Sequence, residues 1–283
     1  MAGCMLAKVC CLAAEPADSS PTVPKRPPLE LFAGPVTLSI AADIGGRLAS
    51  AKWRDFEMLQ TDRDPNGWHW GSTAWTSPQS DWQWPPIATF DSEPFRIVSN
   101  DSESIELESR VDHPTGLQMR KRFRNLASDP RRPTFEIRYE LTNRSDTVQT
   151  VGLWENTRVD HEGEVDVDAS LAMRLNNEDF PPVATIHGGT RTFVLDGEQP
   201  QGQKVFLDSA DFDQPISLRY RRGGVTLTKS MTLSSPVSEN QSPIEIYLAP
   251  EDGFSELELQ GESAELAPGE SVAMTVLWTF SAD

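Results

Sequence analysis

The chain has 283 residues, of which 37% are hydrophobic and 24% charged, so it can bury a core and is too apolar for general disorder. Its formal net charge of −18 repels nucleic-acid phosphates and anionic lipid surfaces, which disfavours both as partners. The three cysteines, Cys4, Cys10 and Cys11, lie in the first eleven residues, which leaves no thiol chemistry or cysteine-ligated zinc for the body of the chain.

The first 27 residues are expected to precede the fold. They are small and apolar at first and then turn polar and proline-rich, like the tail of a secretory leader and its linker. Cys4 follows a sequence that resembles a bacterial lipobox, and Leu12-Ala13-Ala14 offers a signal-peptidase site. The prediction is a periplasmic or extracellular protein, with a lipid anchor at Cys4 or cleavage as alternatives, and a disordered tail as the competing interpretation. No later stretch has about 18 consecutive apolar residues, so no transmembrane segment is expected.

Residues 28–283 are predicted to form a single all-β domain. From Leu29 onward, short alternating runs are separated by glycine, proline, asparagine, aspartate and serine, a pattern typical of strands and turns. The clearest runs are residues 36–40, 47–53, 104–109, 134–141, 225–229 and 272–280. Their period of two indicates antiparallel sheet with one wet face, and no unit recurs at a propeller or solenoid period. The predicted fold is a large antiparallel β-sandwich without convincing helices.

The alternation fails between Asn66 and Pro86, and this segment holds five of the eight tryptophans: Trp68, Trp70, Trp75, Trp82 and Trp84. It is predicted to be a long aromatic loop. Indole rings stack well on the C–H faces of sugars. Hydrogen bonds beside them are expected from His69, Gln79, Asp81 and Gln83. The competing interpretation is that the indoles plug one end of the sandwich, since tryptophans are mostly buried. At least one ring is expected to be exposed.

Several segments together resemble galactose mutarotase-like proteins. They are Asp43–Leu59 (DIGGRLASAKWRDFEML), Phe135–Asp146 (FEIRYELTNRSD), Val151–Asn156 (VGLWEN), Phe254–Leu259 (FSELEL) and Leu266–Ser271 (LAPGES). These segments recur in the family's order across roughly residues 30–280. Within that superfamily the sequence is similar to a bacterial group of unknown function, marked by a Trp- and Pro-rich stretch after the first hairpin. The resemblance implies a supersandwich fold and a carbohydrate ligand, with no cofactor and no metal.

The resemblance also implies an acid and a base, because mutarotation removes a proton from the anomeric hydroxyl and adds one at the ring oxygen. Glu258 matches the late glutamate of the family, and Glu256 on the same strand face is the alternative. The mid-chain position of the family's histidine reads Leu153–Thr157 here and contains none. His69 and His161 are therefore the candidate acids.

Three further residues are predicted to frame a sugar cleft. Arg47 follows two glycines, as a sugar- or phosphate-contacting arginine does in some members of the superfamily, and its alternative is a strand-edge ion pair. Trp154 and Glu155 are expected substrate contacts in the mid-chain strand. The acidic residues between 160 and 168 are interpreted as a solvated face in preference to a calcium site.

Three functional hypotheses follow. The first is an exported carbohydrate-binding or carbohydrate-processing protein, and the second is an aldose 1-epimerase-type mutarotase that uses a glutamate base and a histidine acid. The third is a non-catalytic cell-envelope structural or interaction module. Whether the chain is an enzyme stays open at this point.

Overall fold

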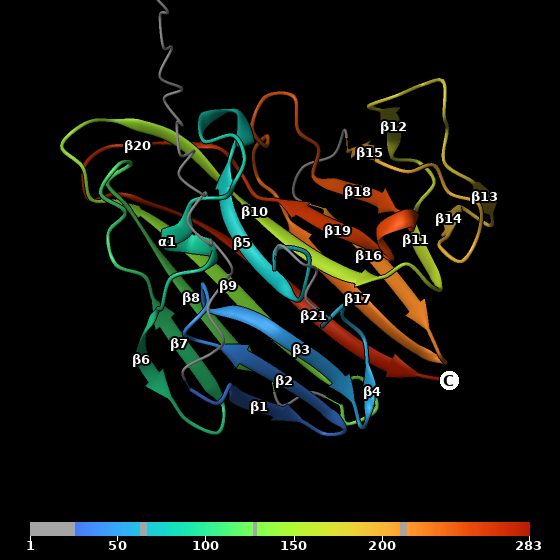
Figure 1. Ribbon diagram of the computed structural model, residues 1–283, viewed down its shortest axis with the longest axis horizontal. Coiled ribbons are helices and arrows are strands. Elements are labelled where there is room, and N and C mark those ends of the chain that lie inside the picture. The colour runs from blue at the N-terminus through green and yellow to red at the C-terminus, as the bar shows by residue number, and fades with distance from the viewer. Residues whose placement is uncertain (1–25, 63–66, 127–128, 210–213) are drawn as a thin grey trace, which may run out of the picture.

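The structure, a computed structural model, describes residues 26–62, 67–126, 129–209 and 214–283. Residues 1–25 of the expected leader and linker, including Cys4, lie outside the described residues. Two large antiparallel sheets face each other across one apolar core, and Figure 1 shows strands β2 and β3 of the first sheet in front of β8 and β9 of the second. The predicted all-β antiparallel sandwich is thereby confirmed.

The first sheet contains eleven strands within the described residues. Nine of them follow the spatial order β1 (Leu29–Ala33), β2 (Val36–Ala41), β3 (Arg47–Trp53), β5 (Ser72–Ser77), β10 (Gln149–Asp160), β19 (Phe254–Gln260), β18 (Ile244–Ala249), β15 (Gln203–Asp208) and β12 (Ala172–Leu175). Two short strands lie off this path: β4 (Phe56–Glu57) pairs with β3, and β20 (Ala264–Leu266) pairs with β10.

The second sheet contains ten strands within the same described ranges. Their order is β13 (Ala184–His187), β14 (Thr190–Val194), β11 (Glu164–Asp168), β16 (Pro215–Arg222), β17 (Val225–Thr232), β21 (Ser271–Ala282), β9 (Thr134–Asn143), β8 (Leu117–Asn125), β7 (Ser104–Glu108) and β6 (Arg96–Asn100). All six runs predicted as strands fall in strands of these two sheets.

Helical structure among the described residues is limited to short turns. They are α1 (Ala88–Asp91) and the 3-10 turns η1 (Gln79–Asp81) and η2 (Pro250–Asp252). None of these helices has the length and apolar character needed to cross a membrane.

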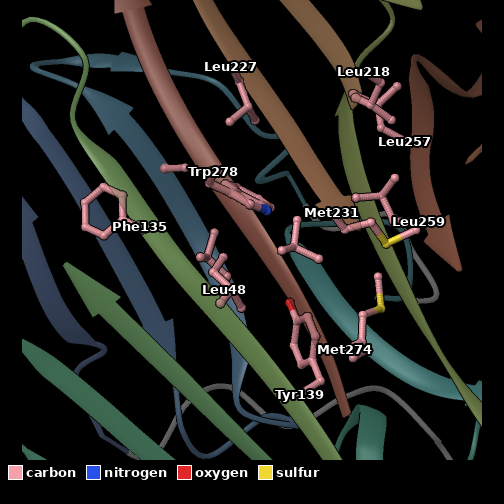
Figure 2. Close-up of a cluster of buried hydrophobic side chains, with 14 of the residues drawn as sticks. Leu48, Phe135, Tyr139, Leu218, Leu227, Met231, Leu257, Leu259, Met274 and Trp278 are labelled. Atoms are coloured by element: carbon pink, nitrogen blue, oxygen red, sulfur yellow. The ribbon is translucent and has the colours of Figure 1, made fainter. Parts of the chain in front are cut away.

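The core is built by strands whose side chains alternate between the two faces of a sheet. In β9, Phe135, Ile137, Tyr139 and Leu141 are buried, while the residues between them are half-buried. Figure 2 shows Phe135, Tyr139 and Trp278 of the second sheet among Leu48, Leu257 and Leu259 of the first. This alternation is the pattern from which the sandwich was predicted.

Strand β5 corrects the prediction of an uninterrupted loop between Asn66 and Pro86. All six of its residues, Ser72–Ser77, are buried, because the core covers one face and other residues of the chain cover the opposite face. Strand β10, its neighbour, is likewise buried from Val151 to Val159. A strand buried on both faces shows no polar alternation, so the sequence pattern could not reveal it.

A buried ionic cluster links the two sheets. Glu155 points inward from β10, and its Oε1 accepts hydrogen bonds from the Tyr139 hydroxyl and from Trp278 Nε1, each at 3.1 Å. Lys229 Nζ lies 2.9 Å from Glu155 Oε2 and donates to Thr157 Oγ1 and to the Leu257 carbonyl. Both charged side chains are fully buried, so each depends on the other for compensation.

The Gly45 turn between β2 and β3 gives a first testable prediction. Gly45 has φ of +63°, and a Cβ there would lie 2.1 Å from the Asp91 carbonyl oxygen, so Gly45→Ala meets both strain and a clash with backbone. We expect a loss of more than about 2 kcal/mol in the free energy of unfolding, measured by urea denaturation. The control is Gly224→Ala, where φ is +74° and no atom lies within 4 Å. Equal losses in both variants would show that the clash has no effect.

Candidate functional site

A cavity of about 610 Å³ lies over the face of the first sheet that points away from the core. Its floor is formed by β10, β15, β18 and β19. Its wall comes from residues 67–86, which include β5 and which we call the tryptophan segment. Its lining residues are Trp68, His69, Trp75, Gln79, Trp84, Trp154, Lys204, Tyr247, Glu256 and Glu258.

Strand parity decides which side chains reach this cavity. In β19, Leu257 and Leu259 point into the core, so Glu256 and Glu258 project to the opposite face. Glu258 pairs across the sheet with Asn156 of β10 on one side and with Glu245 of β18 on the other. The register therefore gathers polar residues from strands far apart in the sequence into one outward patch.

Aromatic rings form the wall of the cavity. The Trp75 and Trp154 rings meet edge to face with centroids 4.9 Å apart, and Trp68 meets Trp84 at 5.6 Å. The His69 ring stacks on Phe254 with centroids 4.6 Å apart. Trp84 is 50% exposed, which agrees with the expectation of at least one exposed indole.

A buried arginine holds this wall in place. Arg47 makes a 2.6 Å ion pair with Asp91, and its guanidinium donates to the carbonyl oxygens of Trp68 and Trp70. Asp91 Oδ1 also accepts a 2.8 Å hydrogen bond from Trp75 Nε1. The pair thus fixes the backbone at Trp68 and the ring of Trp75, two residues of the cavity lining.

The charged floor contains two separate ionic groups. Lys204 Nζ lies 2.9 Å from Glu258 Oε2 and 2.7 Å from Glu245 Oε2. Glu256 instead pairs with the buried Arg158, whose Nε lies 2.7 Å from Glu256 Oε1. The two cavity carboxyls therefore share a strand face and have different cationic partners.

These surroundings push the two carboxyl pKa values in opposite directions. Burial, assisted by the neighbouring Glu245 and Glu256, raises the pKa of Glu258 to about 8, although Lys204 opposes the rise. Burial acts on Glu256 in the same sense, but the charges of Arg158 and Lys204 outweigh it and hold the pKa of Glu256 below its ordinary value. Near neutral pH the two carboxyls of the cavity therefore favour different protonation states, Glu256 ionised and Glu258 protonated.

The structure brings most of the predicted site residues together and places others elsewhere. Glu256, Glu258, His69, Trp68, Trp75, Trp84 and Trp154 line the cavity, whereas Arg47, Trp70, Trp82, Glu155 and His161 are not among its lining residues. Trp154 and Glu155 are neighbours in one strand and must point to opposite faces. Trp70 is buried against Ala41 and Ile44, and its Nε1 donates to the Gly67 carbonyl.

Trp82 and His161 lie outside the cavity lining. The half-buried Trp82 packs against Trp75 and Trp154, and its Nε1 donates to the Thr76 carbonyl. His161 follows the last residue of β10, and its Nδ1 contacts Ser255 Oγ at 2.7 Å. Because Asp160 pairs with Phe254, four residues from Glu258, about 13 Å of strand separate His161 from that carboxyl. His69 is thus the candidate histidine that shares the cavity with the carboxyls.

Sequence reasoning missed Lys204, Tyr247, Glu245 and Arg158. In β18, Glu245 and Tyr247 interrupt an otherwise apolar run, Ile244–Ala249, at a period of two. This pattern was the available signal, because polar residues at alternate positions of an apolar strand indicate a face that points away from the core. Their proximity to Glu258 depends on strand pairings that a single sequence does not display.

Across the described ranges, no group of three or more histidine, cysteine, aspartate or glutamate side chains is arranged to hold a metal ion. The cavity is lined by aromatic, carboxyl and basic side chains and by the amide of Gln79. These features define a β-sandwich with a cavity on its outer sheet face that is lined by aromatic and charged side chains.

Comparison with known proteins assigns the fold. No family model matches the chain, and no curated protein matches it. Similar solved structures include a galactose mutarotase-like protein from Lactobacillus casei, with a TM-score of 0.64 and 11% identity over 89% of this chain and 99% of that one. A galactose mutarotase related enzyme from Lactobacillus acidophilus has a TM-score of 0.60 and 12% identity over 90% and 97% of the two chains. An aldose epimerase homologue from C. elegans has a TM-score of 0.57 and 12% identity over 90% and 98%. The chain has the galactose mutarotase-like fold, as the sequence resemblance predicted.

Proposed function

We propose that the protein binds a carbohydrate in the cavity of the outer sheet face. The carrying observation is the convergence of four indole rings with two carboxyls, a histidine and a lysine in a space of about 610 Å³. That volume is ordinary for a small-molecule site, which typically spans about 300–1,000 Å³. Flat apolar rings suit the C–H faces of a pyranose, and the polar floor suits its hydroxyls. The fold shared with galactose mutarotase-like structures supports the same proposal.

Trp84 tests the binding proposal, because its half-exposed ring lines the cavity. We expect Trp84→Ala to weaken the binding of a neutral aldopyranose by roughly 5- to 30-fold, the effect of losing one stacked ring. Isothermal titration calorimetry with a panel of neutral aldopyranoses measures this. Phe32→Ala, at a 55% exposed aromatic residue on β1, is the matched control and should bind like the wild type.

If no carbohydrate binds the wild-type protein at millimolar concentration, the binding proposal fails, and a non-catalytic cell-envelope module becomes the better hypothesis. If a sugar binds and Trp84→Ala binds it equally well, the tryptophan wall has no part in recognition.

A second candidate function is aldose 1-epimerase-type catalysis within the same cavity. The observation that favours it is the pair of carboxyls on one strand face, with a low pKa at Glu256 and a raised pKa at Glu258. Ionised Glu256 has the state required of a base, and protonated Glu258 has the state required of an acid. This assignment gives Glu258 the opposite role from the base predicted from the resemblance, and His69 becomes an additional polar contact at the wall.

The reaction balances with these two groups. Glu256 takes the proton of the anomeric hydroxyl while Glu258 protonates the ring oxygen, so the bond from C1 to that oxygen breaks and C1 becomes a carbonyl. After rotation about the C1–C2 bond, the former ring oxygen attacks C1 from the other side and returns its proton to Glu258. Glu256 then reprotonates the carbonyl oxygen, and both groups regain their starting states.

A further inference from the structure

We propose that Lys204 and Glu245 are positioning residues that fix the orientation and the protonation of Glu258 and thereby make it different from Glu256. The effect of these residues on a reaction rate rests on the proposed catalysis. Their effect on the protonation of Glu258 is argued from the contacts alone. Lys204 comes from β15 and Glu245 from β18, so neither belongs to the strand that carries the two cavity carboxyls.

Lys204 occupies one oxygen of Glu258 and leaves the other available. Its Nζ lies 2.9 Å from Glu258 Oε2, whereas the fully buried Glu258 Oε1 has no hydrogen-bond partner among the described residues. Since Glu258 lines the cavity, Oε1 is the oxygen left for a ligand. A buried polar atom without a partner is costly, which favours a ligand or water contact at this atom.

Glu245 and Trp154 hold the lysine in this position. Glu245 is 1% exposed, and its Oε2 lies 2.7 Å from Lys204 Nζ, while its Oε1 accepts a hydrogen bond from the Ser242 N–H at 2.9 Å. The ammonium group also lies over the Trp154 ring, with Nζ 4.9 Å from the ring centroid. The lysine is therefore fixed between two carboxyls and an aromatic face.

The charge balance of this trio assigns the proton. One ammonium group faces two buried carboxyls, and both carboxyls ionised together would leave an uncompensated negative charge in a poorly solvated site. Glu245 receives hydrogen bonds on both of its oxygens, whereas Glu258 receives one. The favoured state therefore has Glu245 ionised and the proton on Glu258.

Other titratable groups also lie around Glu258. They are Glu256 on β19, Arg158 on β10, Tyr247 on β18, His69 in the tryptophan segment and Lys229 from the second sheet. Burial alone would lower the pKa of Lys204, but Glu258 and Glu245 raise it, so the lysine stays charged while Glu258 titrates. The pKa of Glu258, about 8, agrees with the proton assignment.

The test is a pH titration of carboxyl ¹³C chemical shifts in protein labelled at glutamate side chains, with Glu258→Gln used to assign the Glu258 signal. Lys204→Met removes the cation that stabilises ionised Glu258, so the pKa of Glu258 should rise. Glu245→Gln removes a competing anion and is isosteric, so the pKa should fall. Each shift should be about one pH unit or more. Lys204→Arg should return the pKa toward the wild-type value, and Lys52→Met, at an exposed lysine of β3, should leave it unchanged.

The alkaline limb of kcat/KM for anomer interconversion should move with these shifts, because the acid form of Glu258 is lost as pH rises through its pKa. An unmoved Glu258 pKa in Glu245→Gln, or shifts of the same sign in Glu245→Gln and Lys204→Met, would overturn the inference. If the wild-type protein interconverts no sugar, the proposed catalysis fails, and the titration still decides the inference.

Discussion

Replacing Glu258 with glutamine should reduce the rate of anomer interconversion by at least about 100-fold, the lower bound for removing a general acid or base. Glutamine keeps the size of the side chain and cannot give a proton to the ring oxygen. Sugar binding should persist within a few-fold, because the tryptophan wall remains intact. Polarimetry on a freshly dissolved aldopyranose measures the rate, and calorimetry measures the affinity.

Glu265→Gln is the matched control for this experiment, because Glu265 is an exposed glutamate on β20, outside the cavity lining. It should convert the sugar at the wild-type rate. Glu256→Gln should show a loss similar to that of Glu258→Gln, since the proposed reaction needs both groups. A Glu258→Gln protein that retains the wild-type rate would contradict the acid role and leave the simpler binding function.

The largest effect on stability is expected at the ionic cluster between the sheets. Lys229→Met removes the cation from the fully buried Glu155 carboxylate, whose remaining donors among the described residues are Tyr139 and Trp278. We expect a loss of about 3–5 kcal/mol in the free energy of unfolding, the usual effect of removing one partner of a buried pair. Urea denaturation followed by circular dichroism measures it.

A double-mutant cycle shows whether pairing is the cause. Glu155→Leu combined with Lys229→Met removes both charges, and the double variant should be more stable than Lys229→Met alone. Arg174→Met, at a pair with Asp208 whose side chains are 44% and 38% exposed, is the control and should change stability by less than about 1 kcal/mol. A double variant as unstable as the sum of its single variants would show that Glu155 and Lys229 are not coupled.

Much of the fold could be predicted from the sequence, because strands with one solvent-exposed face show alternating polar and apolar residues. Strand β9 is an example, since its buried residues alternate with half-buried ones. Strand β5 was not predicted, because all of its residues are buried and no alternation survives. The fold class was therefore accessible, while the central strands beneath the cavity were harder to identify.

The candidate site was predictable only in part, for reasons of parity and pairing. His69 and Glu258 were named from the sequence and share the cavity. Arg47 was expected at the ligand but is buried against Asp91, because the Gly-Gly turn directs it beneath the tryptophan segment. Lys204 could not be found, since only the pairing of β15 with β18 brings it near Glu258.

Strand parity also separates the residues that line the cavity from the residues that pack in the core. On β19 the cavity positions, Glu256 and Glu258, alternate with the core positions, Leu257 and Leu259. Outward positions that lie outside the two ionic groups of the floor, such as Tyr247 on β18, can therefore be substituted in a library without changing the packing between the sheets. Selection for new ligand preference can act on one set of alternate residues while the other set preserves folding, which makes this sheet face a practical starting point for altering specificity.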